Sequence, residues 1–288
     1  DGLYFAMKAV GLDKSSTVLC PAFSYVATAG SIKRLGADIR FTDTDKHGNI
    51  GDWGIMGLPS AVLYVNMFGN LADYTRIKTY CNTHKIPLIE DAAQSQGAMY
   101  GNSPSGSLGD VSVFSFDPMK NMPSFGTGGM VLTDSKDIYD SVISLRRHAF
   151  GGEMPYGYNS LIPEDHAHQL LFLLSKFDKM QKMRENVFKK YKKLLPHLEF
   201  IETQKDTTSS YHKLVMLSNR RDELKTYLAH NGIETKIHYN KTLDNINVGK
   251  YPNAENICAR ALSLPIYPHL KMDEITYICE RIQKFHGV

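Results

Sequence analysis

The sequence has few of the features that mark several common classes of protein. Its four cysteines are widely separated and form no C-x-x-C pair, which argues against a disulfide framework and against a zinc site. The formal net charge is only +3 over 288 residues and the basic residues are scattered, so nucleic acid is not an expected partner. There is no internal repeat, no low-complexity segment and no P-loop or dinucleotide-binding fingerprint.

Long hydrophobic runs are missing as well. The uncharged run 54–72 contains a proline, two asparagines and three glycines, so it fits a buried strand with flanking loops better than a membrane span. No basic-then-apolar leader opens the sequence. Free thiols are typical of a reducing compartment, and together these absences predict a cytoplasmic protein without membrane contact.

What the sequence does have is a strand, a turn and a glycine cluster around one lysine. Val111–Phe116 alternates apolar residues as a buried strand does, and a proline-containing turn, Lys120 and the segment GTGG of 126–129 follow. In open α/β sheets, ligands bind beyond the carboxyl ends of the strands. Lys120 is therefore either a solvated loop charge, the usual role of a lysine, or a positioned amine that could form a Schiff base.

Two more polar side chains stand at predicted strand ends. Asp91 directly precedes AAQSQGA, where it could form a cap or turn, or direct a charge at a bound group. Ser115 lies near the end of the next strand, where it could simply fill a strand position or bond a phosphate. With Lys120, these residues supply what pyridoxal phosphate requires: an amine for its carbonyl, an acid for its ring nitrogen and a hydroxyl for its phosphate.

The fold class follows from short apolar strands that alternate with helical patterns. This alternation predicts a large, doubly wound, mainly parallel sheet in an α/β domain. The predicted strands are Thr17–Cys20, Ile39–Phe41, Ala61–Met67, Pro87–Ile89, Val111–Phe116 and Gly129–Thr133. The predicted helices begin near Leu3, Phe23 and Tyr74. A helix opens the sequence with no lead-in, so either the natural chain starts abruptly or, as we expect, the N-terminal part of this domain is missing.

The second half has a different pattern. From His168 to Leu195, apolar residues recur every three or four positions and predict one long amphipathic helix that ends at Pro196. A smaller α/β portion follows, with predicted strands Leu214–Leu217, Thr235–Tyr239 and Leu262–Ile266 and predicted helices Arg221–Asn231 and Asp273–Phe285. We therefore expect a large cofactor-binding domain over 1–165, and a long linking helix with a small C-terminal domain over 166–288.

Several segments together resemble the DegT/DnrJ family of sugar aminotransferases. They are IEDAAQSQGAMYG, then GSLGDVSVFSF followed by a lysine and GTGGMVLTD, with LCPAFSYVATAGSIKRLGADIRFTD upstream and GYNS, GIETKIHY and ALSLPIYPHL downstream. The resemblance covers almost the whole sequence. It implies an aspartate aminotransferase-like enzyme of fold type I, with pyridoxal 5'-phosphate as cofactor.

The resemblance also implies roles for individual residues. Lys120 would form the Schiff base with the cofactor and then move a proton between cofactor and substrate carbons. Asp91 would pair with the pyridinium nitrogen, Gln94 would lie beside the ring, and Tyr25 would stack on the ring face. Ser115 would bind the phosphate.

Two further roles depend on less direct matches. Asn159 matches an asparagine that in many relatives reaches the phosphate of the neighbouring subunit's cofactor, which implies a homodimer. His238 belongs to the segment that approaches the sugar substrate, although a histidine at a strand end can equally be structural.

The implied reaction is a ping-pong transamination. An amino donor, glutamate in most relatives, would supply the amino group, and a keto group on a nucleotide-linked deoxysugar would receive it, in polysaccharide biosynthesis or antibiotic sugar synthesis. Two alternatives stay open: a truncated or degenerate homologue without catalytic activity, and another fold type I pyridoxal phosphate reaction. A family branch that replaces the lysine with histidine performs dehydration, and Lys120 argues against that branch.

The sequence departs from the family pattern at three places. The usual Ser-Gly-Thr phosphate-binding turn lies before the residues that match Asp1, where this sequence has already begun. Leu161 stands where arginine is usual, which puts the anchoring of the neighbouring subunit's loop in doubt. Asp117 stands where histidine is common.

Overall fold

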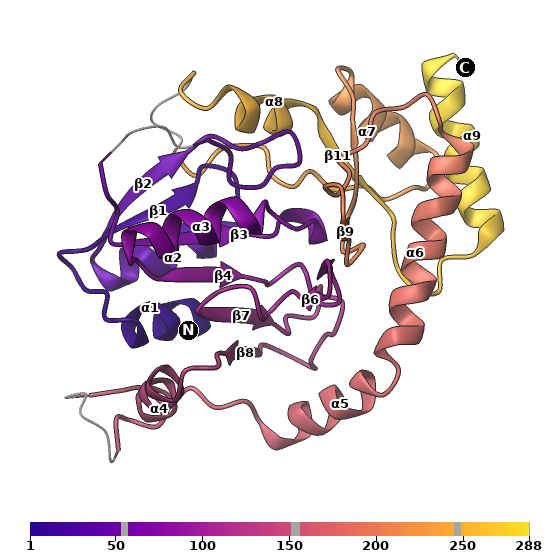
Figure 1. Cartoon of the computed structure of the whole chain (residues 1–288). Helices are drawn as coiled ribbons and strands as arrows, with labels where there is room; N and C mark the ends of the chain where they lie inside the picture. Colours follow the sequence, from indigo (N-terminus) through magenta and orange to yellow (C-terminus); the bar gives the residue numbers. More distant parts are fainter. Residues whose placement is uncertain (53–56, 151–155, 245–248, 288) are drawn as a thin grey trace.

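The computed structural model describes residues 1–52, 57–150, 156–244 and 249–287, and its largest element is a six-stranded sheet (Figure 1). The strand order is β2-β1-β3-β4-β7-β8, in which β8 pairs antiparallel with β7 and the other pairs are parallel. The strands are β1 (Thr17–Pro21), β2 (Asp38–Thr42), β3 (Ala61–Val65), β4 (Leu88–Asp91), β7 (Val111–Ser115) and β8 (Gly129–Leu132). The predicted doubly wound, mainly parallel sheet is confirmed.

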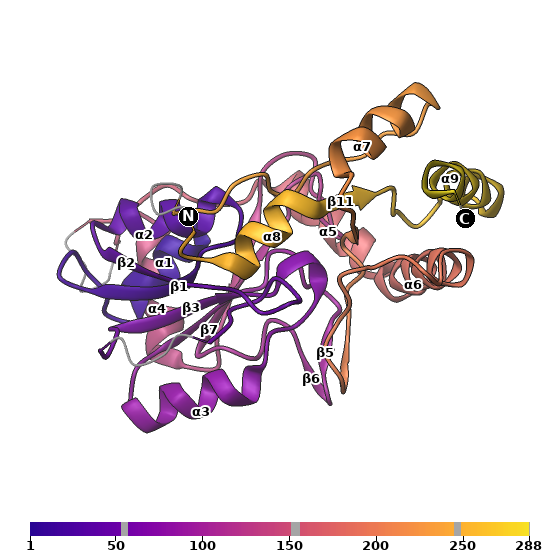
Figure 2. The same cartoon turned by 90° about the horizontal axis from the view of Figure 1, so that it is seen from above.

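Helices cover both faces of this sheet because its strands have successive apolar residues, whose side chains point to opposite faces. α1 (Gly2–Ala9) and α2 (Val26–Leu35) lie on one face, α3 (Tyr74–His84) lies on the other, and α4 (Lys136–Leu145) packs against α1 (Figure 2). The strand side chains divide accordingly: Val18, Cys20, Leu63 and Ile89 pack with α1 and α2, and Leu19, Val62, Tyr64 and Leu88 pack with α3. The sheet thus forms a rigid platform whose strand ends can hold a site.

A second core forms beyond the sheet. Its elements are α6 (Phe177–Leu194), β10 (Leu214–Leu217), α7 (Arg221–His230), β11 (Ala261–Leu264) and α9 (Met272–His286). β10 and β11 pair antiparallel, and α6 lies beside α9. The short strands β5 (Met99–Tyr100), β6 (Ser103–Pro104) and β9 (Thr207–Thr208) form a separate small sheet, and η1 (Met67–Gly69) follows β3. None of the helices in the described residues is long and apolar enough to cross a membrane.

Two helices were not predicted, α4 and α8 (Pro252–Arg260). We call the elements of the second core the small unit, and the six-stranded sheet with its helices the large unit. α8 follows α7 of the small unit in the chain but returns to the large unit, where Ala254 and Ile257 pack in the core that includes α1 and α2. The backbone N–H groups of Asn253 and Ala254 donate to the Asp43 carboxylate after β2, at 3.0 and 2.9 Å. The division of the chain between residues 165 and 166 remains a proposal.

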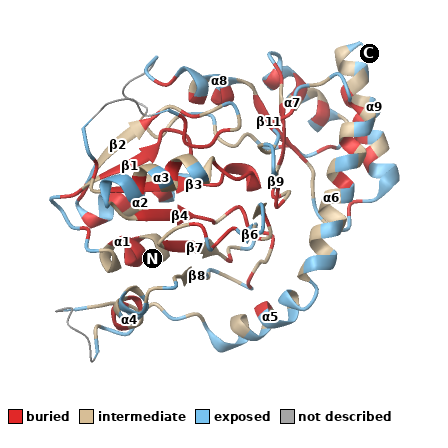
Figure 3. Cartoon of the chain, in the orientation of Figure 1, coloured by how far each residue is buried: buried red, intermediate tan, exposed pale blue. Residues whose placement is uncertain are grey.

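The prediction of one long helix over 168–195 was wrong. The structure has two helices, α5 (Glu164–Leu174) and α6, separated at Ser175 and Lys176. Ser175 and Lys176 form a turn between the two helices, with φ −111° and ψ −3° at Lys176, and the Ser175 hydroxyl donates to the Phe172 carbonyl at 2.7 Å. The break turns α6 toward α9 and leaves α5 largely exposed (Figure 3). Periodicity alone does not detect it because both helices place apolar residues at the same spacing.

The predicted strand Thr235–Tyr239 is also wrong. Only Lys236 pairs in sheet fashion: its N–H donates to the Ser263 carbonyl at 3.1 Å, and the Ser263 N–H donates back at 2.8 Å. The chain then leaves β11 and crosses to the large unit, where the Leu243 N–H donates to the Ala22 carbonyl at 2.7 Å. The apolar residues of this segment therefore line a boundary between the two cores and do not extend a sheet.

Glu90 ties β4 to the loop that leads into β7. Its side chain is completely buried, and every polar contact that it makes is with a donor. The donors are the side chains of Asn66, Ser105 and Ser112 and the backbone N–H groups of Gly106 and Leu108, at 2.7–3.1 Å. Burial raises the pKa of the carboxyl group, and the hydrogen bonds oppose that rise. This network fixes the strand that ends in Asp91.

Replacing Glu90 by glutamine is expected to lower the free energy of unfolding by about 2–3 kcal/mol, because the amide NH2 would face N–H and O–H donors and leave them unpaired. Urea unfolding would show this as a lower midpoint at unchanged slope. Glu234→Gln, at an exposed side chain, is the matched control. Equal midpoints for the two variants would contradict the role given to this network.

Candidate active site

A cavity of about 1240 Å³ opens at the carboxyl ends of β4 and β7 and is bounded by segments from both halves of the chain. Six residues singled out from the sequence line it, namely Tyr25, Asp91, Gln94, Ser115, Lys120 and His238. The seventh, Asn159, is exposed and does not line the cavity, although its neighbour Ser160 does. The fold thus brings together side chains that are more than 200 positions apart in the sequence.

Lys120 lies on a tight turn that follows β7. The turn is closed by the Lys120 N–H, which donates to the Asp117 carbonyl at 2.9 Å, and by the Ser124 N–H, which donates to the Phe116 carbonyl at 2.8 Å. Burial lowers the pKa of the Lys120 amine, and the carboxylates of Asp91 and Asp117 oppose that change. Partial burial in a cavity wall favours the neutral amine, which is the nucleophilic form.

Asp91 ends β4, where it pairs in register with Val65 of β3 and Val113 of β7. Its side chain is buried, and its oxygens accept from the Thr28 hydroxyl at 2.9 Å and from the Ala93 N–H at 3.2 Å. Burial raises the pKa of this carboxyl group, and these two bonds and the nearby Lys120 ammonium oppose the rise. The result is a fixed acid at the cavity wall, held in one orientation.

Aromatic side chains and an amide form the wall near Asp91. Tyr25 precedes α2, is 54% exposed and has its ring centroid 5.9 Å from that of Tyr239. The Gln94 side-chain oxygen Oε1 accepts from the Phe68 N–H at 3.0 Å, and the Gln94 side chain also interacts with the Tyr239 hydroxyl. Tyr239 was missed in the sequence, although it directly follows His238 in the GIETKIHY segment. Two tyrosines therefore present flat rings to this cavity.

Ser115 is the last residue of β7, and its hydroxyl oxygen accepts a 3.4 Å hydrogen bond from the Asp117 N–H. Its carbonyl oxygen accepts from the Gln96 side chain at 3.2 Å. Asp117, where the family often has histidine, also accepts from the Met119 N–H at 2.9 Å, so it shapes the Lys120 turn. Leu161, where the family usually has arginine, is 48% exposed and lines the cavity.

His238 reaches the cavity from the segment after α7. Its Nδ1 lies 2.8 Å from the Ser263 hydroxyl oxygen. Burial, together with the positive charges of Lys213, Lys236 and Lys120, lowers the His238 pKa to about 4. The imidazole is therefore neutral at physiological pH.

We expect the His238 ring protons to show no titration in NMR spectra recorded between about pH 5.5 and 8, because burial and neighbouring ammonium groups both disfavour the imidazolium ion. The signal is assigned by its loss in His238→Gln. A midpoint near the ordinary histidine value of about 6.5 would contradict the environment described here.

Asn121 anchors the Lys120 turn to the small unit. Its side-chain NH2 donates to the Ser210 carbonyl at 2.7 Å, and its oxygen lies 3.1 Å from His212 Nδ1. Because the asparagine nitrogen is the donor in the first bond, the oxygen accepts in the second and His212 Nδ1 carries the proton. This anchor was missed in the sequence, where only its position next to Lys120 could have pointed to it.

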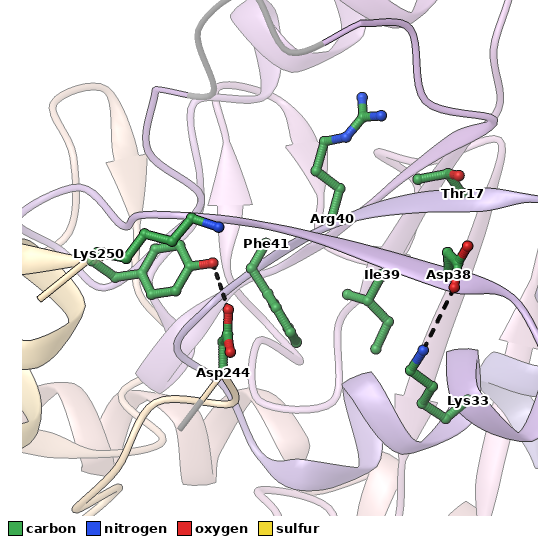
Figure 4. A pocket seen from close by; sticks show the side chains of 9 residues that line it. Thr17, Lys33, Asp38, Ile39, Arg40, Phe41, Asp244 and Lys250 are labelled. Carbon is green, nitrogen blue, oxygen red and sulfur yellow. Dashed lines mark hydrogen bonds and ion pairs between the residues drawn. The ribbon is translucent and has the colours of Figure 1, made fainter. Parts of the chain in front are cut away.

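A second hollow, of about 460 Å³, lies at the β2 edge and is shown in Figure 4. Its lining includes Lys33 and Asp38, 3.9 Å apart, and Tyr251, whose hydroxyl donates to Asp244 at 2.8 Å. None of the predicted site residues lines this hollow. The candidate site is therefore the cavity that holds Lys120.

Comparisons with known proteins agree with this arrangement. The profile of the DegT/DnrJ/EryC1/StrS aminotransferase family matches residues 1–283. A "Pleiotropic regulatory protein" of Geobacillus stearothermophilus is 31% identical, over 99% of this chain and 82% of that protein. GDP-perosamine synthase of Escherichia coli O157:H7 is 28% identical, over 99% of this chain and 83% of that protein. The dTDP-3-amino-3,4,6-trideoxy-alpha-D-glucose transaminase of Streptomyces venezuelae is 28% identical, over 99% and 80%.

Two solved structures show the same fold. The chain matches DesV of S. venezuelae, a structure in complex with a ketimine intermediate, with a TM-score of 0.95 and 27% identity, over 100% of this chain and 83% of that one. It matches a DegT DnrJ EryC1 StrS aminotransferase from Brucella abortus with a TM-score of 0.93 and 27% identity, over 100% and 84%. The fold type I architecture expected from the sequence is confirmed.

Proposed function

The chain belongs to the DegT/DnrJ/EryC1/StrS aminotransferase family, and from this membership we propose that it is a pyridoxal phosphate-dependent sugar transaminase. The amino group comes from glutamate, and the acceptor is a keto group of a nucleotide-linked deoxysugar. The names of two relatives, a GDP-perosamine synthase and a dTDP-amino sugar transaminase, support this substrate class. The observation that carries the proposal is the presence of Lys120 and Asp91 in the wall of one cavity.

The side chains around this cavity fit the proposed cofactor. Lys120 provides a partly buried amine with a lowered pKa, Asp91 a buried carboxylate, Ser115 a hydroxyl, and Tyr25 an aromatic face. When bound, pyridoxal phosphate supplies a carbonyl that takes the amino group from the donor and passes it to the acceptor.

Each residue would have a separate task. Lys120 would hold the cofactor's carbonyl carbon, and its amine would then take up and return the proton at the substrate carbon. Asp91 would keep a proton on the ring nitrogen, and Thr28 orients Asp91 for this task. Ser115 would donate to the phosphate, and Tyr25 would cover the ring beside Gln94. His238 would contact the sugar as a neutral imidazole.

We also propose a homodimer with Asn159 acting at the partner's cofactor phosphate. Asn159 is exposed and outside the cavity of its own chain, as that role requires. Apolar side chains near the cavity, Leu161, Leu171 and Leu174, are 48–66% exposed, and a second copy would cover them. We place the enzyme in the cytoplasm, since its four cysteines are free and buried, and its product in polysaccharide biosynthesis.

The test is amino transfer itself. The protein is incubated with pyridoxal phosphate, glutamate and, in turn, GDP-, dTDP- and UDP-linked keto deoxysugars, and products are identified by mass spectrometry. We expect one amino sugar and one 2-oxoglutarate per turnover with at least one acceptor. Formation of neither product with any acceptor would contradict the proposal and favour a homologue without catalytic activity.

A further inference from the structure

Several basic side chains in and near the cavity lie close enough together for their charges to act on one another. Lys120, Lys213 and Lys236 line the cavity, and Arg184 of α6 lies close enough for its charge to act on Lys213. The two histidines nearby, His212 and His238, have lowered pKa values and are neutral. Of the four basic residues Lys120, Arg184, Lys213 and Lys236, only Lys120 was predicted from the sequence to have a role. The remaining lysines have no task in the function proposed above.

Lys213 stands out within this group because its charge is partly buried and unpaired. Within the described residues, no carboxylate lies within the 4.0 Å ion-pair distance of its amine, whereas Lys236 lies 3.6 Å from Glu234 and has a half-exposed side chain. Burial and the charges of Lys120, Arg184 and Lys236 lower the Lys213 pKa to about 8, although the more distant Asp117 carboxylate opposes the change, and the ammonium form still prevails at pH 7.

The position of Lys213 is fixed from both sides. Its backbone N–H donates to the Phe68 carbonyl at 3.1 Å, and β10 begins with the next residue, Leu214. The residue before it, His212, is buried and bonded to Asn121, which follows Lys120 in the chain. The same contacts therefore position the Lys213 and Lys120 backbones relative to each other.

A partly buried ammonium without a counter-ion lowers stability, and the cost is recovered only when an anion binds beside it. An anion that binds next to Lys120 must belong to a substrate group that is bonded to the reacting carbon, the carbon at which the amino group is exchanged. In an amino acid that group is the α-carboxylate. A nucleotide sugar carries its diphosphate on C1 and its keto group on another ring carbon, so its diphosphate lies farther from the reacting carbon than the α-carboxylate of an amino acid does.

We propose that Lys213 is the subsite for the α-carboxylate of the amino donor, held beside Lys120 by the Asn121–His212 contact. This assignment rests on the function proposed above and names the group by which that site recognises an amino acid. Lys213 is a positioning residue for the donor: it fixes the donor's reacting carbon and takes no proton in the reaction.

The test is a titration of the pyridoxal phosphate-loaded protein with L-glutamate, followed by the change in visible absorption. For Lys213→Met we expect the half-saturating glutamate concentration to rise about tenfold or more, because one charge-assisted hydrogen bond is lost. The rate at saturating glutamate should change little. Isoglutamine, whose α-carboxylate is an amide, should bind equally weakly to both proteins. Glutamine, whose side-chain carboxylate is an amide, should show the same loss as glutamate.

Two further variants check the interpretation. Lys179→Met removes an exposed lysine of α6 that does not line the cavity, and it should leave the half-saturating concentration unchanged. Lys213→Arg keeps the charge and should restore most of the affinity. Equal losses for glutamate and isoglutamine, or equal effects of Lys179→Met and Lys213→Met, would overturn the assignment.

A binding measurement without chemistry separates this proposal from the proposed function. Calorimetry with glutarate, a dicarboxylate that has no amino group, should show binding to the wild type that is weakened in Lys213→Met. If glutamate leaves the absorption unchanged while glutarate binds in a Lys213-dependent way, the transaminase proposal fails and Lys213 stands only as a carboxylate-binding residue. If glutarate does not bind, or binds both proteins alike, the subsite is overturned.

Discussion

Replacing Lys120 by alanine is expected to abolish the visible absorption that pyridoxal phosphate gains on binding, and to slow amino transfer by about 10³-fold or more. The reason is that one amine has two tasks, holding the cofactor's carbonyl carbon and moving the proton at the substrate carbon, and proton transfer alone contributes about 10²–10⁴-fold. The measurement is the absorption spectrum together with the rate of 2-oxoglutarate formation.

The Lys120→Ala variant should remain folded, because the amine is partly buried and its charge costs the folded state free energy. Its unfolding temperature should therefore not fall. Lys136→Ala is the control, since Lys136 is an exposed α4 residue outside the cavity. Near-normal turnover of Lys120→Ala would refute the assignment of Lys120 as the catalytic amine.

Replacing Asp91 by asparagine is expected to lower turnover by about 10²–10⁴-fold and to weaken cofactor binding, while the fold is kept. Asparagine is isosteric and its oxygen can still accept from Thr28, but it carries no charge to hold a proton on the cofactor's ring nitrogen. Steady-state rates and titration with pyridoxal phosphate measure the two effects.

The stability of Asp91→Asn gives an independent check. Burial raises the Asp91 pKa, so the folded state holds the proton more tightly than the unfolded state. Ionisation of Asp91 therefore lowers the stability of the folded state as the pH rises above the pKa that Asp91 has in the unfolded state. Asparagine removes this cost, but its NH2 group faces one donor, the Ala93 N–H, so the free energy of unfolding at neutral pH should fall by less than in Glu90→Gln, where five donor groups surround the carboxylate. Thr28→Val leaves the charge in place and should lower turnover less. Turnover of Asp91→Asn within about threefold of wild type would contradict the role of Asp91.

Much of the large unit could be predicted from the sequence because its signals are local. The central strands β3, β4 and β7 are short, mostly apolar runs that end in or next to polar residues, a pattern typical of buried parallel strands. The placement of Asp91 and Ser115 at adjacent strand ends follows from the parallel pairing of β4 with β7. Strand ends in a parallel sheet meet at one edge, so the position of the cavity could be predicted as well.

The parts that could not be predicted depend on contacts between distant segments. The break at Ser175 precedes a helix, α6, that packs on the distant α9, which begins only at Met272. The segment after α7 is apolar without being a strand because it crosses from one core to the other. In the sequence, Lys213 is indistinguishable from any charged residue before a strand. Only the fold shows that it lines the same cavity as Lys120 and has no ion-pair partner among the described residues.

The measurement that tests the central claim most directly is borohydride reduction of the pyridoxal phosphate-loaded wild-type protein, followed by peptide mass spectrometry, with and without prior addition of glutamate. Without glutamate, we expect the reduced cofactor to be attached to Lys120. With glutamate, we expect that labelling to disappear while 2-oxoglutarate forms, because the donor has displaced the lysine. Attachment to a different lysine, or labelling of Lys120 that glutamate does not affect, would contradict the account.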